Sequence, residues 1–184
     1  RECLSALDFA DEIIICDMHS TDDTIKIAHE FNCKIIYHEK ADCAEVARNW
    51  AHSQISCDWL LVVDSDEIVP KPLAKYLKDF TENKKNYTTL AFPIQDYVWG
   101  KPLHCMYRHS VKRFWKKGCA IYEAHVHGGV KTLEGNDFKI PSGEITLPND
   151  FDIFVWSIVI QPCAKICFGN GKSSAISIPS QYIL

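Results

Sequence analysis

The chain has 184 residues, 47% of them hydrophobic, which is enough for one domain with a real core and at most a small extension. Lys and Arg number 20 against 24 Asp and Glu, so the formal net charge is −4. Because nucleic-acid binding normally shows as clustered Lys and Arg, this balance argues against a nucleic-acid partner.

The first half of the chain alternates short apolar runs with segments whose apolar residues follow helical spacing. The pattern predicts, in chain order, a strand at 11–17, a helix at 22–32, a strand at 34–39, a helix at 42–55, a strand at 58–64 and a helix at 72–83. Ser20 or Thr21 could cap the first helix, and Asp22 and Asp23 would complement its dipole.

This alternation predicts an α/β fold with a mostly parallel sheet and helices on both faces. The strands are continuously apolar, as expected for a sheet that is covered on both sides. In such sheets ligands bind outside the carboxyl ends of the strands. The first strand ends on Asp17, and the third ends in a run of Asp64, Asp66 and Glu67, so acidic residues lie where a ligand is expected.

After about residue 86 the pattern changes. An extended segment and a turn rich in aromatic residues come first, followed by the basic and aromatic stretch "VKRFWKKG". A glycine turn then leads into a run that contains Glu123, His125 and His127. From about residue 150 the tail is apolar and then rich in Gly and Ser, and the pattern assigns no structure to it.

The acidic run closes the segment "WLLVVDSDEIVP". On an extended strand end, Asp64 and Asp66 would point to the same side. Mg²⁺ or Mn²⁺ is commonly held by one or two carboxylates together with phosphate oxygens of a substrate. The alternative is an ordinary polar strand exit without a cation.

Asp17 and Arg48 are two further candidates, each with a structural alternative. Asp17 closes a strand just before a helix, so it could accept a hydrogen bond from a base or ribose, or simply cap the turn. Arg48 lies in the predicted second helix, where a guanidinium could bind a diphosphate through two hydrogen bonds, or could be a surface residue.

Glu123, His125 and His127 alternate along the chain, so in a strand all three would face one way. They could supply a general base, a set of metal ligands or a wall of an acceptor site. A zinc site would need a third and a fourth ligand that the sequence does not show nearby.

The nine cysteines are irregularly spaced, without a CxxC pair. We interpret them as small buried hydrophobic residues in a reducing compartment, which points to the cytoplasm. No signal-peptide pattern is visible, and the longest apolar run is too short to span a bilayer. The chain opens on Arg1 in what looks like a helix, so we expect a piece of a longer protein.

The ordered series "LDFADEIIICDMHSTDDT", "ARNWA" and "DWLLVVDSDEIVP" resembles the family 2 inverting glycosyltransferases of GT-A fold. The branch that it resembles most contains lipopolysaccharide core glucosyltransferases, and the agreement runs through about residues 4–80. The later segment "VKRFWKKGCAIYEAHVHGG" is similar to the family more loosely. A nucleotide-cradling strand of the family would precede Arg1, so the resemblance implies a partial catalytic domain at 1–147 and a C-terminal extension at 148–184.

The resemblance also implies roles for individual residues. Asp17 would bind the nucleotide base, Arg48 would contact the diphosphate side, and Asp64 would face the ribose. Asp66 would ligate the Mg²⁺ or Mn²⁺ ion that bridges the diphosphate, with Glu67 supporting. The candidates for the catalytic base are Glu123, His125 and His127, with Asp96 behind them. The chain departs from the family pattern at Gly128, where relatives carry an acidic residue, and at Leu147, where they often carry histidine.

The implied activity is metal-dependent transfer of a sugar, with inversion, from a nucleotide-diphosphate sugar to a glycan or lipid-linked acceptor. A UDP-sugar is the favoured donor, and the resemblance implies a cytoplasmic protein that could contact the inner face of the membrane peripherally. Two alternatives remain: a truncated, inactive nucleotide-sugar-binding domain, and a DxD-type phosphohydrolase with Asp64 as the nucleophile.

Overall fold

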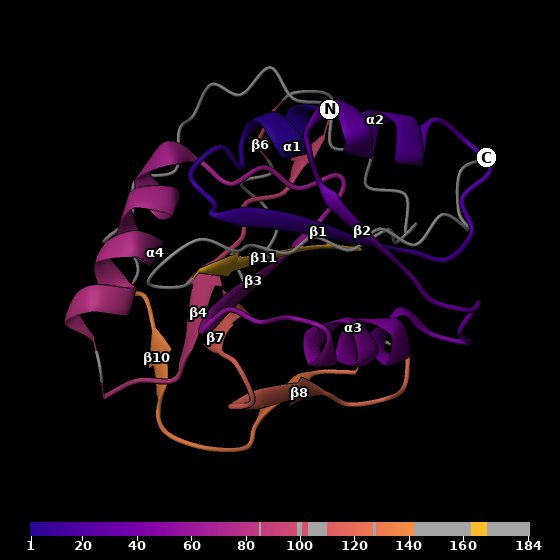
Figure 1. Ribbon diagram of the computed structural model, residues 1–184. Helices are drawn as coiled ribbons and strands as arrows, with labels where there is room; N and C mark the ends of the chain where they lie inside the picture. Colours follow the sequence, from indigo (N-terminus) through magenta and orange to yellow (C-terminus); the bar gives the residue numbers. More distant parts are fainter. Residues whose placement is uncertain (85, 99–100, 103–109, 127, 142–162, 169–184) are drawn as a thin grey trace.

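The computed structural model describes residues 1–84, 86–98, 101–102, 110–126, 128–141 and 163–168 (Figure 1). The helices are α1 (Glu2–Ser5), α2 (Thr24–Glu30), α3 (Ala44–Ser53) and α4 (Lys71–Asn83). The strands of the first half are β1 (Glu12–Asp17), β2 (Lys34–Tyr37), β3 (Trp59–Asp64) and β4 (Thr89–Pro93). Those of the second half are β5 (Tyr97–Val98), β6 (Lys101–Pro102), β7 (Ser110–Lys116), β8 (Ala120–Tyr122), β9 (Val130–Thr132), β10 (Asp137–Lys139) and β11 (Cys163–Phe168).

All six elements predicted for the first half are present, each within a few residues of the predicted bounds. The predicted cap of α2 was wrong. The Thr24 amide donates to the Asp22 carboxylate at 2.9 Å, whereas Ser20 donates to Asp17 instead. The glycine turn predicted before residue 120 is confirmed by Gly118, whose φ of 80° lies in the left-handed region.

The main sheet has seven strands in the order β10-β4-β7-β3-β11-β1-β2. β1 pairs with β2 and β10 with β4 in parallel, and the other four neighbouring pairs are antiparallel. Following these pairings across the sheet, β1, β2, β3, β4 and β10 point one way, while β7 and β11 point the other way. The α/β class is therefore confirmed, but the expectation of a mostly parallel sheet was wrong: β7 and β11 lie between strands of the opposite direction and make the sheet mixed.

Helices cover both faces of this sheet, as predicted. The larger core joins Leu61 and Val63 of β3 with Leu4 of α1 and Leu77 of α4. On the opposite face, Leu60 and Val62 pack with Trp115, and α3 packs on Cys16 through its two buried alanines. Figure 1 shows α1 and α2 on one side of β1 and α3 on the other. Side-chain alternation along a strand divides these residues between the two cores.

β11 comes from the predicted C-terminal extension and lies between β1 and β3. Each of its six residues pairs with one residue of Trp59–Asp64, so it completes the hydrogen bonding of one side of β3. The sequence pattern had assigned no structure to this segment. The predicted boundary at 147/148 falls outside the described residues.

The structure describes the side chains of six cysteines, and all six are free thiols. Cys3, Cys16, Cys33, Cys57 and Cys119 are buried, as predicted for small apolar residues, while Cys43 is half-buried. Burial raises the pKa of the Cys3 thiol to about 12 and that of Cys33 to about 11.

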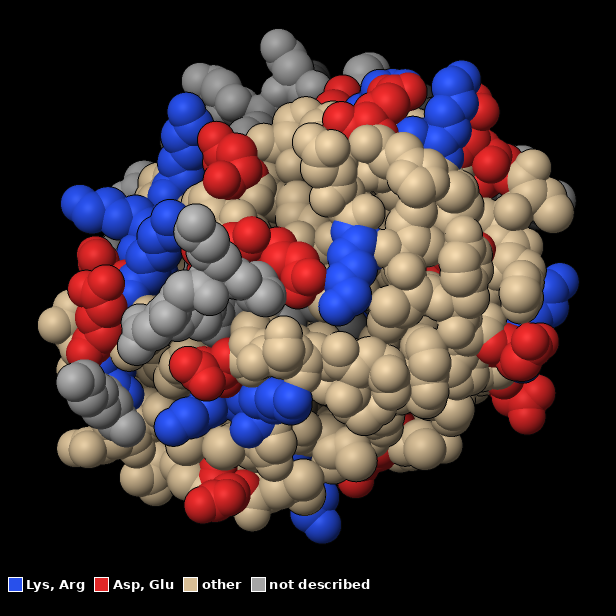
Figure 2. Space-filling model, viewed as in Figure 1, with Lys and Arg blue, Asp and Glu red and all other residues tan. Residues whose placement is uncertain are grey.

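Acidic and basic side chains are intermixed on the face of the molecule shown in Figure 2. Such mixing does not create the extended potential of one sign that steers a charged polymer. Within the described ranges, no helix is both long enough and apolar enough to cross a bilayer.

Candidate functional site

The site lies at the edge of the sheet where β1 and β3 end. These two strands point the same way because both are antiparallel to β11. Asp17 is the last residue of β1 and Asp64 the last residue of β3, so the predicted meeting of acidic strand ends at one edge is confirmed. With β11 between them, the two positions are separated by two strand spacings, about 10 Å.

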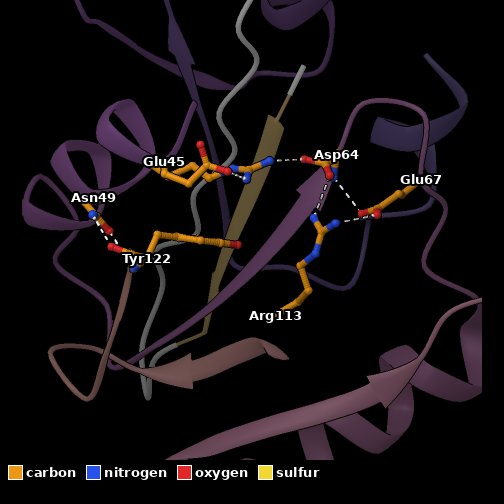
Figure 3. A network of polar contacts seen from close by, with 7 residues as sticks. Glu45, Asn49, Asp64, Glu67, Arg113 and Tyr122 are labelled. Carbon is orange, nitrogen blue, oxygen red and sulfur yellow. Dashed lines mark hydrogen bonds and ion pairs between the residues drawn. The ribbon is translucent and has the colours of Figure 1, made fainter. Parts of the chain in front are cut away.

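Asp64 is 8% exposed and lies between two guanidinium groups. Its Oδ1 accepts a hydrogen bond from Arg48 Nη2 at 2.9 Å, and its Oδ2 lies 2.8 Å from Arg113 Nη1 (Figure 3). Both cations are shielded from solvent, which strengthens their attraction for the carboxylate. Asp64 is therefore held as a buried anion in one orientation.

Arg48 reaches Asp64 from α3 and is only 4% exposed. Its Nη1 lies 3.5 Å from Oε1 of Glu45, one helical turn earlier, and its guanidinium lies 5.0 Å from the ring centroid of Tyr122. The alternative of a surface arginine is therefore wrong. The helix brings Glu45 and Arg48 to the same face because residues three apart are neighbours there.

Arg113 was not among the predicted site residues, although it completes the ion network. It comes from β7, the strand next to β3, and also donates through Nη2 to Glu67 Oε1 at 3.0 Å. The signal in the sequence was weak, namely one arginine directly before the buried Phe114 and Trp115. The contacts of Arg113 with Asp64 and Glu67 become apparent only once β7 pairs with β3.

Glu67 closes the turn that follows β3. Its Oε2 accepts a hydrogen bond from the Asp64 amide at 2.8 Å, and its own amide donates to the Asp64 carbonyl at 2.9 Å. Burial, assisted by the charge of Asp64, raises the pKa of Glu67 to about 7 against the opposing effect of Arg113. Burial alone would lower the pKa of Arg113, but the carboxylates of Asp64 and Glu67 outweigh it and raise that pKa.

Asp66 lies at the tip of this turn, and its side chain is exposed. The strand ends at Asp64 and residues 65–66 form a turn, so the predicted alternation that would place Asp64 and Asp66 on one side does not apply. Desolvation by the surrounding protein and then the charge of Asp64 raise the pKa of Asp66. A carboxylate that is costly to ionise in this way gains from a nearby cation.

The turn offers a metal ion one outward-facing carboxylate, not a full set of protein ligands. No cluster of three or more His, Cys, Asp or Glu side chains able to hold an ion occurs in the described part of the chain. Asp64 and Glu67 are engaged by arginines, which leaves Asp66 as the outward-facing carboxylate of the turn. Mg²⁺ often binds in this manner, through one or two carboxylates with the remaining ligands from phosphate and water.

Asp17 is 1% exposed, and its carboxylate accepts hydrogen bonds from the amide of Ser20 at 3.0 and 3.2 Å and from its hydroxyl. The turn cap that the sequence offered as the alternative is therefore formed. Tyr37, the register partner of Asp17 on β2, is 55% exposed and stacks on His19 with the ring centroids 6.2 Å apart. An accessible aromatic surface thus adjoins Asp17.

The predicted strand through Glu123, His125 and His127 was wrong, because β8 ends at Tyr122. Glu123 and His125 are exposed in a tight turn in which the His125 amide donates to the Glu123 carbonyl at 2.8 Å. A Cβ atom at Gly128 would lie 2.0 Å from that carbonyl oxygen, so this backbone requires glycine there. His127 lies outside the described residues.

Asn49 attaches the end of β8 to α3. Its side-chain amide donates to the Tyr122 carbonyl at 2.9 Å, and its Oδ1 accepts from the Tyr122 amide at 3.0 Å (Figure 3). Asn49 is next to Arg48 in α3, and Tyr122 directly precedes Glu123. These hydrogen bonds therefore fix the start of the Glu123 turn relative to Arg48. The chain brings together Arg48, Asp64 and the residue before Glu123, while Asp17 lies two strands away.

Comparison with known proteins matches residues 1–129 to a family model described as "Glycosyl transferase family 2". An uncharacterised glycosyltransferase of Rickettsia felis is 32% identical over 96 residues, which cover 52% of this chain and 33% of that protein. A second, from Rickettsia conorii, is 30% identical over the same coverage. A TPR repeat-containing protein of Synechococcus elongatus is 41% identical over 66 residues, 35% of this chain and 16% of that protein. The matched regions thus span a third or less of these curated relatives.

Proposed function

This chain belongs to glycosyltransferase family 2, and from that premise we propose that it takes part in metal-dependent transfer of a sugar, with inversion, from a nucleotide-diphosphate sugar to a glycan or lipid-linked acceptor. The observation that carries the proposal is the ion network at the end of β3. It buries Asp64 between Arg48 and Arg113 and leaves Asp66 exposed at the tip of the next turn.

The nucleotide would lie along the edge between β1 and β3. Asp17 would accept hydrogen bonds from the base, and the exposed ring of Tyr37 offers a surface on which the base could stack. Asp64 would face the ribose through the lone pairs that its arginines leave free, since a carboxylate can accept about four hydrogen bonds. The resemblance implied that Arg48 contacts the diphosphate, but its guanidinium is buried beside Glu45 and Asp64, so in this proposal it acts on the donor through Asp64 instead.

Asp66 would hold the Mg²⁺ or Mn²⁺ ion. When bound, the ion would neutralise the charge that develops on the leaving diphosphate. The described residues favour this arrangement because Arg113 already pairs with the carboxylates of Asp64 and Glu67. Asp66 is therefore the carboxylate of the turn that could bind a metal ion.

Transfer would be a single displacement at the anomeric carbon. The acceptor oxygen forms the new bond to carbon, the bond from carbon to the diphosphate oxygen breaks, and the acceptor proton passes to a base of the protein. Glu123, His125 and His127 are the candidate bases, and a base in this position would contribute about 10²–10⁴-fold. We favour Glu123, whose neighbour Tyr122 is held against α3.

A UDP-sugar is the donor that we favour. For the acceptor we propose a cell-envelope glycan of the lipopolysaccharide type, with the protein in the cytoplasm and peripheral at the inner face of the membrane. The phosphohydrolase alternative is disfavoured because both oxygens of its nucleophile, Asp64, are in contact with guanidinium groups.

The test is a donor screen with the full-length protein that contains this chain. Release of UDP, GDP or dTDP from the matching sugar donors is measured with Mn²⁺ and with EDTA. Asp66→Ala should abolish metal-dependent release, whereas Asp79→Ala, a change at an exposed residue in the interior of α4, should not.

Full activity of Asp66→Ala, or turnover that is indifferent to EDTA, would remove the metal role. Nucleotide binding without transfer under every donor would instead favour the inactive binding domain.

A further inference from the structure

The turn that carries Asp66 is held at both ends by the same cation. Arg113 Nη1 lies 2.8 Å from Asp64 Oδ2, before the tip, and its Nη2 donates to Glu67 Oε1 at 3.0 Å, after the tip. Two backbone contacts between Asp64 and Glu67, at 2.8 and 2.9 Å, close the same loop. These contacts hold residues 64 and 67 on either side of Asp66, whose own side chain is exposed.

The guanidinium is suited to this position in a way that an ammonium is not. Its planar fork can satisfy two carboxylates at once in fixed directions, whereas a lysine offers one compact charge on a flexible stem. β7 supplies the anchor, since its following residues Phe114 and Trp115 are fully buried in the core and pair with β3. Arg113 is thus fixed relative to the strand from which the turn emerges.

From this geometry we propose that Arg113 and Glu67 are a positioning pair that sets the Asp66 carboxylate for the metal–diphosphate group of the donor. Neither residue touches the donor in this proposal. The inference rests on the proposed function, in which Asp66 binds the metal.

A purely compensating role for Arg113 makes a different prediction. If Arg113 only balances the charge of Asp64 and Glu67, lysine would serve equally well, because the charge is conserved. If it positions the turn, Arg113→Lys breaks one of the two carboxylate contacts and loosens Asp66 even though the net charge is the same.

The experiment measures UDP binding by isothermal titration calorimetry to the full-length protein, in Mn²⁺ and in EDTA. For Arg113→Lys we expect UDP affinity in Mn²⁺ to fall about tenfold, as for the loss of one charge-assisted hydrogen bond, and affinity in EDTA to change less than about twofold. Glu67→Gln should act in the same direction, because its amide group cannot accept from both Arg113 and the Asp64 amide.

Lys112→Gln is the matched control. It breaks an ion pair of comparable length, 2.7 Å, between the residue next to Arg113 and Asp137 of β10, a strand that β4 and β7 separate from β3. UDP affinity of this variant should equal that of the wild type in both conditions. Thermal unfolding of all variants identifies any that fail to fold, and Glu67→Gln then carries the test if Arg113→Lys does not fold.

The outcomes separate the two proposals. If the wild type binds UDP more tightly in Mn²⁺ than in EDTA but Arg113→Lys and Glu67→Gln behave like it, the positioning role is overturned and the proposed function stands. If the wild type shows no Mn²⁺-dependent binding of UDP, the metal role fails and the positioning role fails with it.

Discussion

The strongest prediction for stability concerns Asp64, because two buried arginines converge on its carboxylate. Asp64→Asn keeps the size and shape of the side chain but removes its charge. An asparagine oxygen could still accept from Arg48, but its NH₂ group would then face Arg113 Nη1, a donor against a donor. Arg48 would retain Glu45 at 3.5 Å, and Arg113 would retain Glu67 at 3.0 Å.

The magnitude follows from this geometry. The substitution breaks two charge pairs of 2.9 and 2.8 Å at a residue that is 8% exposed. Removing one partner of a buried pair costs about 3–5 kcal/mol, because the remaining charge stays buried without full compensation. For a domain of this size, such a loss lowers Tm by about 6–20 °C.

The assay is urea unfolding at pH 7 followed by circular dichroism, with thermal unfolding as a second measure. Asp23→Asn is the control, because it makes the same chemical change at a residue whose ion pair with Lys26, at 3.7 Å, is exposed. The control should lose about 0–1 kcal/mol. If Asp64→Asn also lost less than about 1 kcal/mol, the ion network would not hold the end of β3, and the argument built on it would fail.

Two further predictions concern contacts outside the ion network. Partial burial opposes ionisation of Asp137, but hydrogen bonds from Lys112 and Thr132 outweigh it and lower the pKa of Asp137 from its usual 3.8 to about 2. The stabilisation from ionised Asp137 is therefore present above pH ~4 and lost as the pH falls towards 2. The free energy of unfolding, measured with urea, should fall between pH 5 and pH 3 by a smaller amount in Asp137→Asn than in the wild type, and the difference should be less than about 1 kcal/mol. Asn49→Ala leaves the Tyr122 amide and carbonyl without their partners and should cost about 2 kcal/mol, with faster hydrogen exchange of the Tyr122 amide; unchanged exchange would contradict the proposed attachment of β8 to α3.

The elements of the first half were predictable because their signals are local. Continuous apolar runs such as Trp59–Val63 favour buried strands, and the spacing of Leu73, Leu77 and Phe80 favours the helix that covers them. The same rule failed after Tyr122. Alternating residues there suggested a strand, but the tight turn at Glu123 and the required glycine at 128 end it.

The candidate site was predictable only in part. A strand that ends on Asp64 places that residue at the ligand-binding edge, and the family resemblance directed attention to Arg48 as well. Arg113 and Asn49 contribute contacts that join residues 46 and 73 positions apart in the chain. No local pattern specifies such pairings, since they depend on which strands become neighbours.

The sequence by itself determined the class of the fold, the order of its first six elements and the placement of acidic residues at strand ends, because periodicity and chain order are properties of neighbouring residues. Only the tertiary structure decided that β7 and β11 run against the other strands, that Arg113 spans the acidic turn, and that Asp66 rather than Asp64 faces outward. These outcomes depend on long-range pairing, which places charges within hydrogen-bond reach of one another and buries them together.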